Sequence, residues 1–139
     1  MTISYLTDMD GVLHREGEPI AGASEFISTL REEGIEFMVL TNNSIQTPRD
    51  LSAKLVRMGL EIEPERIWTS ATATAKFLSQ QAGEASAYVI GEAGLTTALH
   101  EIGWILTDAD PDFVVLGETR TYSFEALTTA SNLIRNGSR

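Results

Sequence analysis

The sequence predicts an α/β fold with a mainly parallel sheet. Short apolar runs alternate along the chain with segments in which apolar residues recur at helical spacing, and a glycine closes most of these segments. Polar residues directly follow the first two apolar runs. This alternation is typical of open parallel sheets covered by helices, which bind ligands outside the carboxyl ends of their strands.

The first predicted strand starts at Tyr5 and ends in the sequence Asp8-Met9-Asp10-Gly11. Because strand residues i and i+2 point the same way, Asp8 and Asp10 can face one site, and Gly11 permits a sharp turn behind them. Two carboxylates so close repel each other unless a cation or a shared proton intervenes. The spacing therefore implies a bound divalent metal, a protonated acid, or both. An ionised Asp8 could attack phosphorus, while a protonated Asp10 could donate to the leaving oxygen.

This motif has two other interpretations. An EF-hand calcium loop also begins Asp-x-Asp-Gly, but it needs oxygen ligands or glycine where this chain has Val12 and Leu13, and a Glu where it has Pro19. The calcium loop is therefore excluded. An ordinary turn rich in Asp and Gly remains open on these residues alone.

A second apolar strand runs from Glu36 and ends in Thr41-Asn42-Asn43. It follows the first after about thirty residues, the length of one βαβ unit, so the two strands are expected to be parallel neighbours. Their carboxyl ends would then meet at one edge of the sheet, bringing the Thr41 hydroxyl to the carboxylates of Asp8 and Asp10.

The remaining elements are predicted from the same two patterns, short apolar runs for strands and apolar residues at helical spacing for helices. Helices are expected over residues 23–30, 48–58, 70–78 and 95–102 and in a last segment ending near Gly137, with strands over residues 67–68, 87–90 and 113–116. Trp68 and Trp104 lie in short apolar runs and are expected in the core. His14 follows the Asp8-Met9-Asp10 motif closely enough to suggest a substrate contact, but it has no partner carboxylate pattern and is expected at the surface. His100 lies beside the apolar stripe of its helix and is expected to be solvated.

The motifs DMDGVL at residues 8–13 and VLTNNS at residues 39–44 resemble the first two motifs of the haloacid dehalogenase (HAD) superfamily of phosphatases. Residues 69–75, 88–92 and 111–122 are similar to its NagD-type branch. The resemblance runs nearly end to end and implies a Rossmann-like core with an inserted α/β cap of the C2 type. Residues 1–83 would form the first half of that core, and residues 84–139 the first half of the cap.

For the site, the resemblance implies a nucleophile at Asp8 and an acid/base at Asp10. A magnesium ion would be held by the Asp8 carboxylate and the Asp10 backbone carbonyl. Thr41 would hold the transferred phosphoryl group, and amides of Asn42 and Asn43 would receive phosphate or substrate. The implied activity is hydrolysis of small phosphorylated metabolites, such as nucleotide or sugar phosphates, through an aspartyl-phosphate.

In the implied cap, Glu118 and Arg120 follow a strand end. A loop there could read the leaving group of the substrate, with Arg120 as the anion partner. A salt-bridged surface loop is the equal alternative.

The chain also departs from the family pattern. Family members are longer, and a lysine and a distal acidic metal ligand come from their C-terminal half. The only lysines here, Lys54 and Lys76, fall in helical patterns, and the acidic run at residues 108–112 is interpreted as a turn before a strand. We therefore expect these 139 residues alone to hydrolyse little or nothing.

Composition limits the other function classes. Ten basic against twenty acidic residues give a formal charge of −10, which argues against nucleic-acid binding. The absence of cysteine excludes disulfides and thiol catalysis. Neither a secretory signal nor a membrane-spanning run is visible, so a cytoplasmic location is expected.

Two further possibilities stay open. The chain could be a phosphoryl-binding or regulatory module without turnover, of which a receiver-like phosphoacceptor is the best version. It could also fold only with a partner or as a homodimer, because half a sheet leaves unpaired strand edges.

Overall fold

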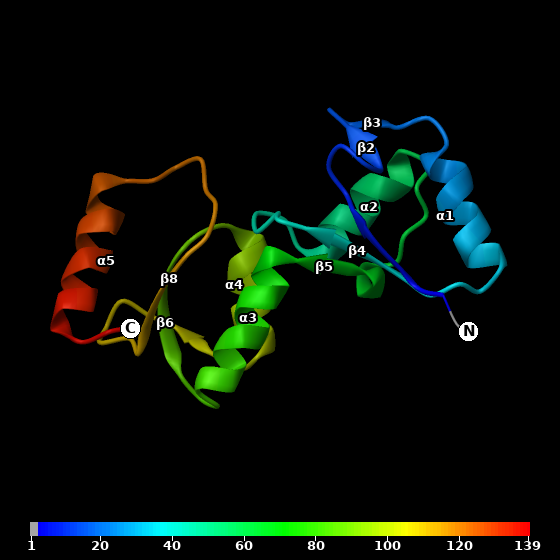
Figure 1. Ribbon diagram of the computed structural model, residues 1–139. Helices are drawn as coiled ribbons and strands as arrows, with labels where there is room; N and C mark the ends of the chain where they lie inside the picture. The colour runs from blue at the N-terminus through cyan, green and yellow to red at the C-terminus, as the bar shows by residue number, and fades with distance from the viewer. Residues whose placement is uncertain (1–2) are drawn as a thin grey trace. The chain divides into compact units, whose positions relative to one another are not determined.

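The computed structural model describes residues 3–139, which form two compact units (Figure 1). The first unit contains residues 3–42 and 48–69, and the second contains residues 43–47 and 70–139. Each unit has its own parallel sheet and its own apolar core. The predicted α/β fold with mainly parallel strands is confirmed.

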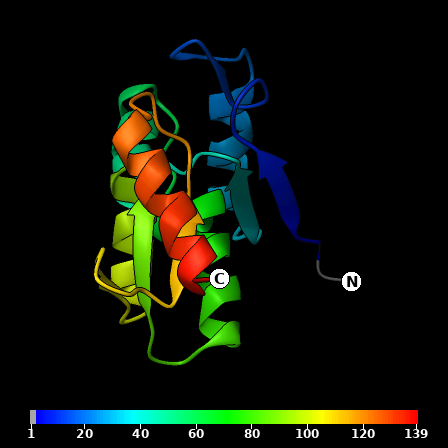
Figure 2. The same cartoon turned by 90° about the vertical axis from the view of Figure 1, so that its left-hand side faces the viewer.

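The first unit is built on a three-stranded parallel sheet with strand order β1-β4-β5. Its elements are β1 (Tyr5–Asp8), β2 (His14–Arg15), β3 (Glu18–Pro19), α1 (Ala23–Glu32), β4 (Phe37–Thr41), α2 (Pro48–Arg57), the 3₁₀ turn η1 (Pro64–Arg66) and β5 (Ile67–Thr69). In Figure 2, β1 and β4 lie side by side as arrows that point the same way. The register pairs Asp8 with Leu40 and Thr41 with Thr69, so the three strands end together at one edge.

Apolar side chains at helical and strand spacing explain why this unit folds. In α1 the buried residues are Ala23, Ile27 and Leu30, whereas Phe26, the fourth residue of the expected i, i+3, i+4, i+7 stripe, is 37% exposed. This stripe joins Met9, Leu13 and residues of β4, α2 and β5 in one buried cluster. Burial of Met9 matters for the site, because it fixes the residue between the two motif carboxylates.

The second unit is a three-stranded parallel sheet with strand order β7-β6-β8, together with three helices. Its elements are α3 (Ser70–Gln81), β6 (Ser86–Ile90), α4 (Ala93–Glu101), β7 (Ile105–Leu106), β8 (Phe113–Leu116) and α5 (Phe124–Asn136). Helix α3 packs against α4, and α5 runs beside β8 (Figures 1 and 2). The small buried residues Ala71 and Ala75 of α3 allow this close packing.

The two compact units have their own limits along the chain. The division of the backbone falls between Thr69 and Ser70, which places α3 in the second unit, and the short segment 43–47 also belongs there. One cause is visible in the contacts, because the Gly94 amide donates to the Ile45 carbonyl at 2.8 Å. The assignment of residues 1–83 to a core and 84–139 to a cap stays a prediction.

Three local features differ from the sequence predictions. The hairpin β2–β3 and the two-residue strand β7 were not predicted, because strands this short show no measurable periodicity. Trp68 was wrongly expected in the core and is 37% exposed, whereas Trp104 is buried as predicted. The Trp104 ring lies 4.9 Å from that of Phe113, and its indole N–H donates to the Gly83 carbonyl at 3.2 Å.

Within residues 3–139, none of the helices combines the length and the apolar character needed to cross a bilayer.

Candidate active site

The carboxyl edge of the first sheet brings the predicted carboxylates and hydroxyl together. Asp8 ends β1 and Thr41 ends the neighbouring parallel strand β4. The Thr41 Oγ1 atom lies 3.5 Å from Oδ2 of Asp10. The threonine is buried and Asp10 is exposed, so the carboxylate stands at the rim of the edge with a fixed hydroxyl behind it.

The backbone around Asp8 holds its side chain in place. Met9 is 1% exposed and points into the core, which leaves Asp8 and Asp10 outside it. The Met9 amide donates to Asp8 Oδ1 at 2.7 Å. One oxygen of Asp8 is therefore fixed by its own backbone, and the side chain is exposed to solvent.

The turn after β1 is closed by backbone hydrogen bonds. The His14 amide donates to the Met9 carbonyl, and the Gly11 amide donates to the His14 carbonyl at 2.8 Å. Gly11 has φ 79°, a left-handed conformation that glycine adopts without strain. The predicted sharp turn at Gly11 is confirmed.

His14 contradicts the sequence-based expectation of a surface position. It is only 3% exposed, because the hairpin β2–β3 folds it back under the turn. Its Nε2 atom lies 3.5 Å from Oδ1 of Asp10. His100, by contrast, is exposed on α4 as predicted.

The donors at this edge fit magnesium. These donors are oxygens, namely the Asp8 carboxylate and the Asp10 carbonyl. The β-bridge between Asp10 and His14 is made by the Met9 carbonyl and the Gly11 amide, so it does not use the Asp10 carbonyl. Mg²⁺ binds oxygen and commonly takes one or two carboxylates, with water and substrate phosphate as its other ligands. In the part of the chain that the structure describes, no cluster of three or more His, Cys, Asp or Glu residues is placed to hold a metal. The residues present thus fit a magnesium site of few protein ligands.

Asn42 and Asn43 directly follow β4, and a hydrogen-bonded turn begins at Asn43. Asn42 is exposed at the end of the first unit. In the second unit, Asn43 Oδ1 accepts hydrogen bonds from the amides of Ile45 at 3.0 Å and Gln46 at 2.9 Å. The Asn43 side-chain oxygen thus shapes the turn that follows it.

Glu118 and Arg120 lie on a loop that is held at several points. The Glu118 amide donates to Ser44 Oγ at 3.0 Å, the Thr119 hydroxyl donates to Glu92, and the Tyr122 hydroxyl donates to the Gly117 carbonyl at 2.7 Å. The Glu118 and Arg120 side chains are exposed, and within residues 3–139 neither forms an ion pair. The salt-bridged loop is therefore not the arrangement of the described residues.

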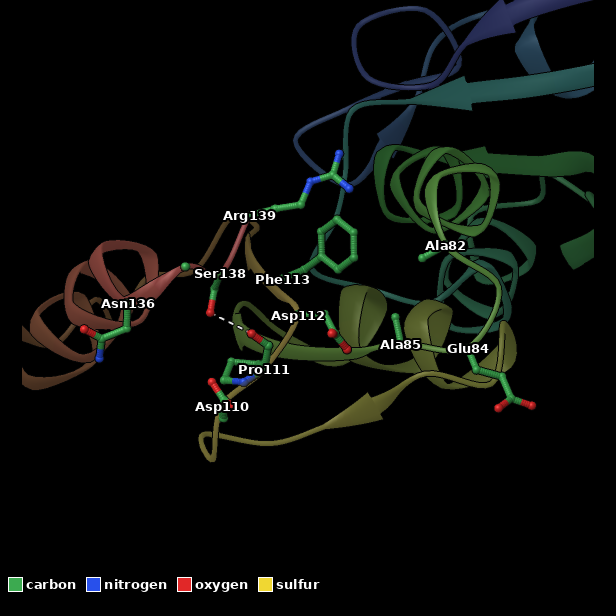
Figure 3. A pocket seen from close by; sticks show the side chains of 11 residues that line it. Ala82, Glu84, Ala85, Asp110, Pro111, Asp112, Phe113, Asn136, Ser138 and Arg139 are labelled. Atoms are coloured by element: carbon green, nitrogen blue, oxygen red, sulfur yellow. Dashed lines mark hydrogen bonds between the residues drawn. The ribbon is translucent and has the colours of Figure 1, made fainter.

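The acidic run at residues 108–112 borders a hollow of about 430 Å³ in the second unit (Figure 3). Asp112 accepts hydrogen bonds from the Ser86 amide and hydroxyl, both at 2.8 Å. These bonds hold the pKa of Asp112 below its usual range, and the bond from the hydroxyl contributes more than the bond from the amide. Across the hollow, the Ser138 hydroxyl donates to the Pro111 carbonyl at 2.6 Å. Asp112 therefore ties a loop to the amino end of β6, as expected of a turn.

Both lysines lie where the sequence predicted, Lys54 in α2 and Lys76 in α3.

The sequence analysis expected His14 at the surface and offered it to the site only as a possible substrate contact, not as a buried neighbour of Asp10. The available signal was Glu16-Gly17, a pair suited to a two-residue hairpin turn, with φ values of 53° and 90°. Thr69, the last residue of β5, also lies at this edge. It is 1% exposed and opposite Thr41, and adds a second hydroxyl to the strand ends.

Comparison with known proteins identifies relatives of this chain. The profile of the family described as haloacid dehalogenase-like hydrolase matches residues 5–105. The chain is 70% identical over 139 residues to dihydroxyacetone phosphatase of Corynebacterium glutamicum (strain R), covering 100% of this chain and 50% of that protein. It is 39% identical over 140 residues to ribonucleotide monophosphatase NagD of Escherichia coli (strain K12), covering 100% of this chain and 56% of the relative.

A solved structure agrees with these matches. NagD from the E. coli K-12 strain superposes with a TM-score of 0.91 at 38% identity, over 100% of this chain and 56% of that chain. The chain thus spans about half the length of the curated relatives it matches. With the family profile matching most of its residues, the chain belongs to the haloacid dehalogenase-like hydrolases, and it resembles the NagD proteins among them.

Proposed function

We propose that this chain is the catalytic N-terminal part of a magnesium-dependent phosphomonoester hydrolase that acts through an aspartyl-phosphate. The observation that carries the proposal is the carboxyl edge of the first sheet, where Asp8 ends β1 and Asp10 faces the Thr41 hydroxyl at 3.5 Å. Family membership supports the same chemistry, because the relatives reported above are named phosphatases.

In the first step, the free oxygen of Asp8 attacks phosphorus and the bond from phosphorus to the leaving oxygen breaks. Asp8 suits this role because its other oxygen is held by the Met9 amide, which orients the carboxylate. Asp10, in its protonated form, gives its proton to the leaving oxygen. The Thr41 hydroxyl donates to an oxygen of the transferred phosphoryl group.

Magnesium, held by the Asp8 carboxylate and the Asp10 carbonyl, would offset the repulsion between Asp8 and the anionic substrate. This offset is needed because the chain carries a formal charge of −10, which repels phosphate at long range.

In the second step, Asp10 takes a proton from a water molecule, whose oxygen attacks the phosphorus of the aspartyl-phosphate. The acyl-phosphate bond breaks, inorganic phosphate leaves and Asp8 is restored. One residue thus serves as acid and then as base, and this requires its carboxylate to stay at the reacting oxygens in both steps.

The proposed substrate is a small phosphorylated metabolite. The first candidate is dihydroxyacetone phosphate, because the relative with 70% identity is named dihydroxyacetone phosphatase. Ribonucleoside monophosphates are the second, from the name of the NagD relative. We propose that Asn42 and Asn43 receive substrate or phosphate and that Glu118 and Arg120, in the cap, distinguish between leaving groups.

The test uses the protein at its natural full length. Release of phosphate from dihydroxyacetone phosphate, a ribonucleoside monophosphate and an aryl phosphate is measured with and without magnesium, for wild type and Asp8→Asn. Asparagine keeps the oxygen that accepts from Met9 but cannot form the acyl phosphate, so activity should fall by about 10⁴-fold or more. The control is Asp110→Asn, an exposed loop position with φ 51° that asparagine adopts easily.

Turnover by Asp8→Asn would remove the nucleophile from the proposal. Stable phosphorylation of the full-length wild type by a small phosphodonor, without release of phosphate, would instead favour the phosphoryl-binding module.

A further inference from the structure

His14 is a buried side chain whose ring nitrogens have no hydrogen-bond partner among the described residues. It is 3% exposed, and both Nδ1 and Nε2 are inaccessible to solvent. Burying a polar ring without partners is unfavourable, and buried polar groups in proteins are nearly always paired. The only charged group recorded near either nitrogen within residues 3–139 is Asp10, whose Oδ1 lies 3.5 Å from Nε2.

Asp10 is therefore contacted on both of its oxygens. Oδ1 faces the imidazole of His14 at 3.5 Å, and Oδ2 faces the hydroxyl of Thr41 at 3.5 Å. The first contact comes from the hairpin that follows the motif and the second from the next strand of the sheet. These two contacts, made by different elements, restrict the orientation of a carboxylate whose side chain is 56% exposed.

The support beneath His14 is rigid. The preceding residue, Leu13, is 2% exposed and belongs to the core of the first unit. The Ile20 amide donates to the Leu13 carbonyl at 3.0 Å, which closes the hairpin β2–β3 behind it. His14 itself pairs through its backbone with Met9 and Gly11, so the ring and the motif belong to one hydrogen-bonded turn.

We propose that His14 is a positioning residue for Asp10, a role that rests on the phosphatase function proposed above. A proton on Nε2 donates to Asp10 Oδ1 and fixes the plane of the carboxylate, leaving Oδ2 at the Thr41 side to exchange its proton with the reacting oxygens. The contact is longer than a good hydrogen bond, and such contacts often tighten when substrate is bound. His14 touches neither substrate nor metal in this scheme.

Three substitutions separate positioning from packing. His14→Gln keeps an N–H close to the place of Nε2. His14→Asn has the same amide one methylene shorter and cannot reach Asp10. His14→Phe keeps the buried ring and removes both nitrogens. The matched control is His100→Gln, which removes an exposed imidazole on α4.

In the full-length protein we expect His14→Phe and His14→Asn to lower kcat by about 10- to 100-fold with KM changed less than about threefold, since a misplaced catalytic group costs rate rather than binding. His14→Gln should recover kcat to within about threefold of wild type. A packing role predicts the reverse order, with His14→Phe the best tolerated. Either that order or a change confined to KM overturns the proposal. If His14→Phe does not fold, as judged by its melting temperature, the comparison of Gln with Asn decides alone.

A second measurement does not depend on activity. Crystal structures of the full-length wild type and His14→Phe are compared for the side-chain angles of Asp10. Reorientation or disorder of the carboxylate in the variant supports positioning, and an unchanged Asp10 overturns it. If the wild type hydrolyses no phosphate ester, the proposed function fails, and these structures still judge the role of His14.

Discussion

The two units of this protein each contain an Asp-x-Asp sequence, with opposite environments. Asp8-Met9-Asp10 begins at the last residue of strand β1 in the first unit, whereas Asp110-Pro111-Asp112 precedes strand β8 in the second. The middle residue is buried in both, so both motifs turn their carboxylates away from a core. In the first motif Asp10 faces a hydroxyl and an imidazole at 3.5 Å each, while in the second Asp112 accepts two hydrogen bonds from Ser86 at 2.8 Å.

The difference shows that the position of a motif relative to its strand decides its use. The carboxyl ends of parallel strands form the edge where ligands bind in open α/β sheets. The amino end of β8 lies at the other edge of its sheet, where Asp112 joins its loop to the neighbouring strand β6. A carboxylate already satisfied by the fold has little capacity left for chemistry.

Of the differences between the two units, the largest is expected when one aspartate of each motif is replaced separately by asparagine. In the full-length protein, Asp10→Asn should lower kcat by about 10²- to 10⁴-fold, because the amide cannot transfer the proton. Asp112→Asn keeps an oxygen for Ser86 and should leave kcat within about twofold of wild type. Steady-state phosphate release measures both. Equal losses in the two variants would contradict the distinction between the motifs.

The next effect is a loss of stability from substitutions in the two apolar cores, which are separate clusters of buried residues. Leu55 in the first and Leu99 in the second are both fully buried. Truncation of either to alanine should lower the free energy of unfolding by about 2–5 kcal/mol, from lost apolar contacts and the cavity left behind. Denaturant titration gives the size of the loss, and hydrogen exchange gives its place. We expect faster exchange mainly in the unit that carries the substitution, and uniform acceleration across both would argue for one shared core.

A smaller effect is expected where residues 43–47 pack against α4 within the second unit. A Cβ on Gly94 would lie 2.6 Å from the carbonyl oxygens of Ser44 and Gln46, and these backbone atoms cannot easily move. Gly94→Ala should destabilise the protein by about 1–3 kcal/mol and displace the segment that begins with Asn43.

The matched control is Gly83→Ala, because a Cβ there has no neighbour within 4 Å. Thermal melts of the two variants should differ clearly, and equal melting temperatures would show that the segment adapts without cost.

The smallest effect is the titration of Asp112. Its pKa is lowered by the Ser86 hydroxyl and then by the Ser86 amide, so Ser86→Ala should raise that pKa toward the ordinary value of about 3.9. A lowered pKa in the folded state stabilises the protein above the unfolded pKa, and this contribution disappears as pH falls through the folded value. Carboxyl carbon NMR shifts of Asp112 against pH measure the change. An unchanged pKa would show that the hydroxyl does not stabilise the carboxylate.

The sequence by itself determined most of the secondary structure and the reactive end of β1. The helices and all the longer strands were predicted, because their signals are local: the spacing of Ala23, Ile27 and Leu30 along α1, the proline at Pro48, and apolar runs such as Phe113–Leu116. The reactive end of β1 was predicted for the same reason. The spacing of Asp8 and Asp10 and the turn at Gly11 depend only on neighbouring residues.

Only the tertiary structure decided which side chains share the site and which residues are buried. His14 lies under Asp10 because a hairpin of two-residue strands folds back, and strands so short carry no periodic signal. Trp68 is exposed although it stands in an apolar run, because burial depends on what packs against a strand. Segment 43–47 joins the second unit through contacts with Gly94 and Glu118, far along the chain. Such long-range contacts form between residues whose separation in sequence carries no repeating pattern, so they are absent from any local reading of the chain.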